Sequence, residues 1–146
     1  MFYFVSLIVF ALDRAVKFLV VKTLEPVGSV QFLKSPLYFT YVSNTGVAFG
    51  FFRDHRAALI VIGMIVCAVV AYFYMKSNRN DTFFILALAL IMGGSLGNLF
   101  DRVVFGYVID YIDLKFFAVF NLADMAINVG VLLILFEIFR GSKCIQ

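Results

Sequence analysis

Two aspartates, Asp110 and Asp124, are the residues of this sequence best suited to catalysis. Asp124 lies near the start of a long apolar run, and Asp110 lies in the short segment that leads into that run. A carboxylate at membrane depth is energetically costly, so it marks a functional site by default. Two carboxyls that share a site cannot both ionise cheaply, so one of them keeps a proton. The pair therefore predicts general acid–base chemistry on a substrate in or at the membrane.

Asparagines and an arginine are spaced to lie near these acids. Asn121 and Asn128 stand three and four residues from Asp124, which predicts one polar stripe on an otherwise apolar helix. Asn98 and Arg102 are one helical turn apart and could together orient a carboxylate or a peptide carbonyl. The stripe alone is also compatible with a structural hydrogen-bond network or an ion path.

Asp13 and Lys17 are four residues apart in the first apolar run and should form an ion pair. The pair has two interpretations: it neutralises the charges so that the helix can insert, or it reaches the site from a third helix. A buried ion pair is weak evidence for stability, so the spacing does not decide between them. Gly93 and Gly97 form a GxxxG pair, which favours close helix packing in lipid.

Other kinds of catalytic site find little support in the sequence. The only histidine, His55, stands at the start of the second apolar run, where a hydrated interfacial residue is the more economical interpretation. Cys67 and Cys144 form no CxxC pair and have no metal-ligand spacing. We therefore expect no metal site, no cofactor and no covalent intermediate.

Composition places the chain in a membrane. Hydrophobic residues make up 64% of the 146 residues and charged residues 14%, against about 25% charged in soluble domains. Four runs are long enough to cross about 30 Å of hydrocarbon. They cover residues 2–23, 56–75, 82–99 and 120–139. We expect an all-α polytopic membrane protein with four transmembrane helices, forming a single domain over residues 1–146.

The connections predict the remaining structure and the orientation. The loop 24–55 contains two β-rich stretches, Val30–Leu33 and Leu37–Val42, which predict a small hairpin after the first helix. The end of this loop, Asn44–Phe52, is apolar and should lie on or in the bilayer, and a second loop is expected at 100–119. Basic residues directly follow the second and fourth runs, and basic flanks favour the cytoplasmic side. With four spans, both termini are then expected in the cytoplasm. The net charge of +3 then reflects membrane flanks and predicts no nucleic-acid partner.

Five motifs occur in an order that resembles the bacterial lipoprotein signal peptidase, or type II signal peptidase, family. They are Asp13–Lys17, Asn44–Phe49, Gly93–Arg102, Val108–Tyr111 and Phe120–Asp124. Each motif alone is weak evidence, but together they extend across nearly the whole chain.

The resemblance implies a multi-pass aspartic peptidase of the bacterial inner membrane, with its active site toward the periplasm. It would cut the signal peptide from prolipoproteins just before a diacylglyceryl-modified cysteine. Its partners would be these lipid-modified substrates, membrane lipids and the cyclic peptide antibiotics that inhibit the family. By position, Asp110 and Asp124 match the catalytic pair. Residues matching the rest of the site are Asn44, Gly46, Asn98, Arg102, Asn121, Asp13 and Lys17.

Further expectations follow from the resemblance and from the chain itself. The sheet after the first helix would be the small periplasmic β-cradle of the family, and Arg14 stands where relatives often have an uncharged polar residue. No helix face is left over for a partner, so we expect a monomer. The alternative from the acids alone is a small proton-coupled transporter or channel subunit that uses them as a relay. Such proteins commonly contain internal repeats, and the sequence contains none.

Overall fold

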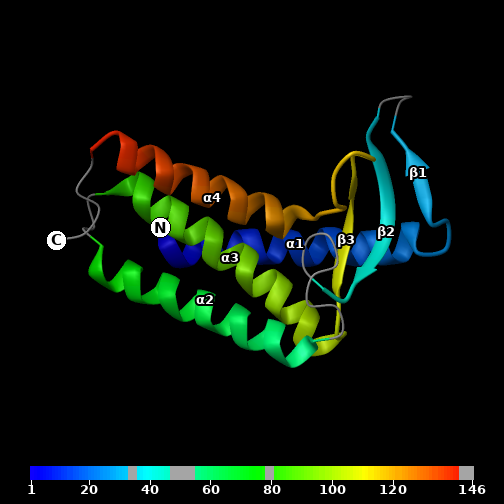
Figure 1. Cartoon of the computed structure of the whole chain (residues 1–146), viewed down its shortest axis with the longest axis horizontal. Coiled ribbons are helices and arrows are strands. Elements are labelled where there is room, and N and C mark those ends of the chain that lie inside the picture. Colours follow the sequence, from blue (N-terminus) through cyan, green and yellow to red (C-terminus); the bar gives the residue numbers. More distant parts are fainter. Residues whose placement is uncertain (33–35, 47–54, 78–80, 142–146) are drawn as a thin grey trace.

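The computed structural model describes residues 1–32, 36–46, 55–77 and 81–141. The elements follow in the order α1 (Phe2–Leu24), β1 (Ser29–Gln31), β2 (Tyr38–Asn44), α2 (Arg56–Lys76), α3 (Thr82–Val104), β3 (Val108–Asp113) and α4 (Leu122–Phe139). Figure 1 shows the helices running roughly alongside one another, with the sheet gathered at one end of the bundle. The mostly helical prediction with a small sheet is confirmed.

Three helices, α2, α3 and α4, are long and apolar enough to cross a membrane. The fourth, α1, has 23 residues but carries charged side chains midway along its length. Two of these, Asp13 and Lys17, are only 0% and 1% exposed. Its exposed side chains include Tyr3, Phe4 and Leu7. The charges in the middle of α1 therefore face protein, and its outer surface near the N-terminus is apolar.

The bundle is organised around α3, which packs against α1, α2 and α4. The GxxxG pair lies where α3 meets α1. A Cβ atom at Gly93 would lie 2.7 Å from the Cβ of Val9, and one at Gly97 would lie 2.5 Å from Oδ2 of Asp13. The predicted close packing is confirmed, and at Gly97 it brings α3 against the buried carboxylate.

The sheet has the strand order β1-β2-β3, and both pairings are antiparallel. The predicted hairpin is confirmed as β1 and β2, with Val30 opposite Phe39. The third strand was not predicted, because its segment was assigned to a loop at 100–119. It forms because β2 offers a free edge, where Val42 pairs with Asp110 and Asn44 with Val108.

The boundary predicted for the third helix was wrong. It was placed at Leu99, whereas α3 continues to Val104. The polar residues Asp101 and Arg102 marked the end of the apolar run, but Asp101 is fully buried and partnered inside the protein. The helix can therefore carry these residues through its last turns. Residues 47–52 of the predicted apolar loop lie outside the described residues.

Candidate active site

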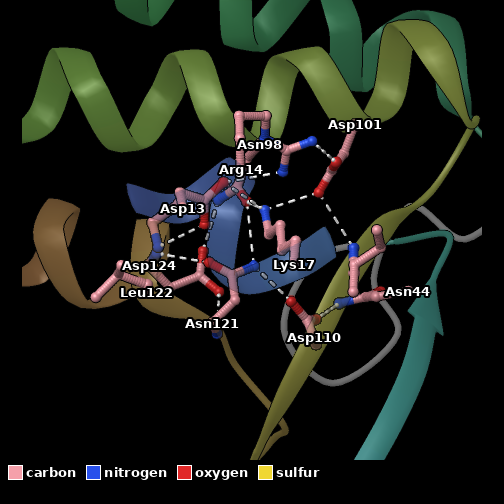
Figure 2. A network of polar contacts seen from close by, with 12 residues as sticks. Asp13, Arg14, Lys17, Asn44, Asn98, Asp101, Asp110, Asn121, Leu122 and Asp124 are labelled. Atoms are coloured by element: carbon pink, nitrogen blue, oxygen red, sulfur yellow. Dashed lines mark hydrogen bonds and ion pairs between the residues drawn. The ribbon is translucent and has the colours of Figure 1, made fainter. Parts of the chain in front are cut away.

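Polar residues of three helices, α1, α3 and α4, meet polar residues of the sheet in one network (Figure 2). The last turns of α3, the first turn of α4, the middle of α1 and strand β3 all contribute to this network. Asp110 and Asp124 belong to it, although they stand on different elements. The network therefore depends on tertiary packing.

Both carboxylate oxygens of Asp110 accept hydrogen bonds from asparagine side chains. Asn121 donates to Oδ1 at 2.6 Å, and Asn44 donates to Oδ2 at 2.8 Å. The Asn44 amide is oriented by the backbone N–H of Gly46, which donates to its oxygen at 2.9 Å. The turn after β2 thus presents an N–H group to the carboxylate on β3.

Asp124 is held at the N-terminus of α4 by a capping box. Its backbone N–H donates to Oδ1 of Asn121 at 2.9 Å, and its own Oδ2 accepts from the backbone N–H of Asn121 at 3.2 Å. Asn98 on α3 donates to the other oxygen, Oδ1, at 2.8 Å. These bonds hold the carboxylate against α3 in one orientation.

Asn98 and Asn121 join the two carboxylates into one network. The Oδ1 atom of Asn98 accepts from Lys17 Nζ at 3.1 Å and from the Asn121 side chain at 3.1 Å. An ammonium has donors only, so it keeps the oxygen of Asn98 toward itself and the NH₂ group toward Asp124. Lys17 therefore determines which group Asn98 presents to Asp124.

Behind these asparagines lie four charged residues that balance one another. Lys17 Nζ lies 3.0 Å from Asp13 Oδ2 and 2.7 Å from Asp101 Oδ2. Arg14 contacts the same two acids, at 3.0 Å for Asp13 and 2.5 Å for Asp101. The predicted pair of Asp13 and Lys17 is confirmed, as part of a cluster of two acids and two bases. We call these four residues the charge cluster.

The charge cluster also holds backbone groups near the two aspartates. Asp13 Oδ1 accepts from the backbone N–H of Ala123 at 3.2 Å, and Asp101 Oδ2 accepts from that of Ile109 at 3.2 Å. The Tyr111 hydroxyl accepts from the backbone N–H of Leu122 at 3.1 Å. The first N–H groups of α4, which have no partner within the helix, are thus satisfied from α1 and β3. This fixes where α4 starts.

A cavity of about 300 Å³ opens beside the two aspartates. The polar residues that line it are Asn44, Gly46, Asn98, Arg102, Asp110, Asp124 and Asn128. Its apolar side is formed partly by the segment Phe117–Phe120, which follows β3. Arg102 reaches toward the carbonyl of Gly46, with 3.4 Å between nitrogen and oxygen. A chain that entered this cavity would meet two carboxyls, amide groups and a guanidinium.

Asp110 has a perturbed acidity. Burial raises its pKa to about 7, and the nearby charge of Asp124 adds to the rise. The hydrogen bonds from Asn44 and Asn121 act in the opposite direction, because N–H donors stabilise the charged carboxylate. A carboxyl with a pKa near 7 suits proton transfer at neutral pH.

The sequence predicted most of these residues but missed three. Asp101, Arg14 and Tyr111 were not expected at the site. Asp101 stood beside Arg102 in a polar pair at the end of an apolar run, which was the available signal. Nothing in the sequence pointed to the hydroxyl of Tyr111 as a helix cap. Within the described residues, no group of three or more His, Cys, Asp or Glu is arranged to bind a metal ion.

Comparison with known proteins gives consistent results. The family model described as signal peptidase (SPase) II matches residues 5–140. A lipoprotein signal peptidase of Halothermothrix orenii is 40% identical, covering 98% of each chain. One of Caldanaerobacter subterraneus subsp. tengcongensis is 44% identical over 94% of this chain and 95% of its own. A bacterial membrane enzyme structure at 2.3 Å superposes with a TM-score of 0.86, at 28% identity over 94% of this chain and 87% of that chain.

The charge cluster leads to a prediction about Asp13 and Lys17. Asp13→Asn or Lys17→Met leaves one uncompensated buried charge, whereas the double variant leaves the Arg14–Asp101 pair balanced. We expect each single change to cost about 3–5 kcal/mol and the double change to cost less than their sum. Thermal unfolding in detergent measures these differences. The control is the pair of Lys115 and Asp113, in which the lysine side chain is half exposed. A double variant that is stable and fully active would mean that the pair serves only for insertion.

Proposed function

Because this chain belongs to the signal peptidase II family, we propose that it is an intramembrane aspartic endopeptidase that cleaves diacylglyceryl-modified prolipoproteins. It removes the signal peptide by cutting just before the lipidated cysteine. The observation that carries the assignment of residues is that Asp110 and Asp124 line one cavity and each is held by N–H donors. Family membership favours a peptidase over a proton-coupled transporter or channel subunit.

The dyad shares one proton. We assign it to Asp110, whose pKa is raised to about 7 by burial and by the charge of Asp124. Asp124 keeps the negative charge, because it stands at the positive end of α4, whereas Asp110 lies on a strand. Protonation of such a pair belongs to both residues together, so the assignment describes the major form.

Catalysis then proceeds without a covalent intermediate. Asp124 takes a proton from water, which attacks the carbonyl carbon of the scissile peptide bond, while protonated Asp110 polarises the carbonyl oxygen. The tetrahedral intermediate collapses as a proton passes to the amide nitrogen of the leaving cysteine. The products are a carboxylic acid and a free amine, and the dyad again holds one proton. No cofactor takes part in these steps.

The remaining predicted residues have positioning roles in this proposal. Asn44, Asn98 and Asn121 orient the two carboxyls. Arg102 and the turn at Gly46 line the cavity that receives the substrate backbone. Asp13 and Lys17 act through Asn98 and through the start of α4. The segment Phe117–Phe120 covers the peptide from the other side.

The proposed topology follows from the arrangement of charges. Four spans form one domain over residues 1–146 in the bacterial inner membrane, with α1 counted as a span because its buried charges are balanced. The ends of α2 and α4, which carry Lys76 and Arg140, lie away from the sheet (Figure 1). Basic flanks favour the cytoplasm, so the termini are cytoplasmic and the sheet is periplasmic. The protein acts as a monomer and binds the cyclic peptide antibiotics that inhibit the family.

The direct test replaces each catalytic carboxyl by an amide. Asp110→Asn and Asp124→Asn should each retain less than about a tenth of wild-type turnover, because an amide cannot exchange protons. Gel-shift processing of a lipidated precursor measures turnover, and thermal unfolding checks that both variants fold. EDTA and alkylation of cysteines should leave the wild type active. Loss of activity with EDTA that zinc restores would contradict the aspartic mechanism.

The pH dependence follows from the raised pKa of Asp110. A carboxyl with a pKa of about 7 is protonated below pH 7 and loses its proton above it. We therefore expect kcat/KM to fall by about tenfold per pH unit well above pH 7. Asn44→Ala removes an N–H donor that favours the carboxylate, so it should move this decline to higher pH. Asn128→Ala, which changes the same cavity from α4, should leave the decline in place; a shift in both variants, or in neither, would contradict the assignment.

Lipid-dependent recognition gives a separate prediction. Asp110 lies on β3 and Asp124 in the first turn of α4, so the scissile bond must be presented at the sheet end of the bundle. Two acyl chains would hold it there, since burial contributes about 0.8 kcal/mol for each methylene. A precursor with an unmodified cysteine should be cleaved far more slowly in the same bilayer. Equal rates for the two precursors would reject lipid-dependent recognition and would leave the aspartic mechanism untouched.

A further inference from the structure

A second groove runs along α1 and α3, on the side away from the candidate active site. Three cavities lie in line along it, of about 490, 290 and 360 Å³ from the sheet end inward. Phe100 lines the first and the second, and Phe10 and Leu96 line the second and the third. The shared walls make the three cavities sections of one groove, which we call the α1–α3 groove.

The groove is separated from the active site by α3 and β3. On α3, Phe100 faces the groove while Asn98 and Arg102, two residues to either side, face the active-site cavity. Two residues along a helix turn the side chain by about 200°. On β3, Ile109 lines the groove and Asp110 lines the active site, as expected for successive residues of a strand. A ligand in the groove therefore cannot touch the catalytic pair.

Polarity changes along the groove. The section at the sheet end contains the charged residues Arg14, Lys17 and Glu25 and the hydroxyls of Tyr41 and Tyr107. The middle section is lined by apolar residues only: Phe10, Leu96, Leu99, Phe100 and Val103. The inner section is also mostly apolar. A polar end near the sheet and an apolar channel toward the bundle centre match a phospholipid of the leaflet on that side.

The charges at the polar end decide which head group fits. Arg14 lies over the ring of Phe100 at 4.9 Å, and its Nε has no hydrogen-bond partner within the described residues. Its side chain is 19% exposed, so a modest shift would present this N–H to a phosphate. Glu25 is exposed and forms no ion pair within the described part of the chain. Glu25 therefore places a carboxylate on the lining of this end, where it would attract an ammonium and repel an anionic head group.

We propose that the α1–α3 groove binds one zwitterionic aminophospholipid. Its ammonium lies by Glu25 at the mouth, its phosphate faces Arg14, and one acyl chain follows Phe100, Leu96 and Phe10 inward. The glycerol backbone then lies beside Tyr41 and Tyr107. This lipid is separate from the diacylglyceryl group of the substrate, whose cysteine must reach the other side of α3.

The test measures lipid retained by the purified full-length protein, using native mass spectrometry in detergent. The probes are phosphatidylethanolamine, phosphatidylglycerol and diacylglycerol, offered at equal concentrations. We expect one phosphatidylethanolamine per protein, retained about tenfold better than phosphatidylglycerol. Glu25→Gln should bring the two phospholipids to similar retention. Inorganic phosphate at millimolar concentration should not displace the lipid, because it cannot fill the apolar section.

A blocking variant tests the acyl-chain channel. Leu96 is partly exposed and lines two sections, so Leu96→Trp should fill the channel and reduce retention at least about fivefold. Leu132→Trp, at an exposed position on α4, is the matched control and should retain lipid as the wild type does.

Three outcomes would overturn the proposal. The first is equal retention of both phospholipids by the wild type, and the second is equal retention by the Leu96→Trp variant and its control. The third is displacement by free phosphate alone, which would indicate an anion site. If the second outcome came with a raised KM of Leu96→Trp for lipidated precursor, the groove would belong to the substrate's acyl chains.

Discussion

One buried ammonium, that of Lys17, is the contact on which the rest of the site depends. It lies within 3.1 Å of Asp13, Asp101 and Asn98, and its side chain is 1% exposed. An ammonium in such surroundings is tolerable only because two carboxylates share it with Arg14. The same contacts hold α1 against the end of α3. The ion pairs that balance the buried charges therefore also fix the position of α1 against α3.

The charge cluster positions the proposed catalytic groups through two sets of contacts. Through Asn98, Lys17 determines that an N–H rather than an oxygen faces Asp124. Through Asp13, the charge cluster accepts the N–H of Ala123 and so fixes the first turn of α4. Donors and acceptors then meet in one network with Asn121 at its centre, and side-chain amides hold both carboxyls.

Strand β3 contributes the second carboxyl of the site and separates the active-site cavity from the α1–α3 groove. Asp110 faces the active-site cavity, and Ile109, next to it, faces the α1–α3 groove. Asp101 anchors the strand by accepting the N–H of Ile109. One strand thus separates a cavity suited to peptide hydrolysis from the polar end of a groove suited to a membrane lipid.

The sequence by itself determined the helices, the hairpin, the two aspartates and the Asp13–Lys17 pair, because apolar length, strand composition and helical spacing are local properties. Tertiary structure decided the rest. Strand β3 exists because β2 offers an edge, and α3 extends past Asp101 because that acid is neutralised from α1. The role of Tyr111 also depends on where α4 begins. Such contacts join residues far apart in the chain, and no local pattern encodes their geometry.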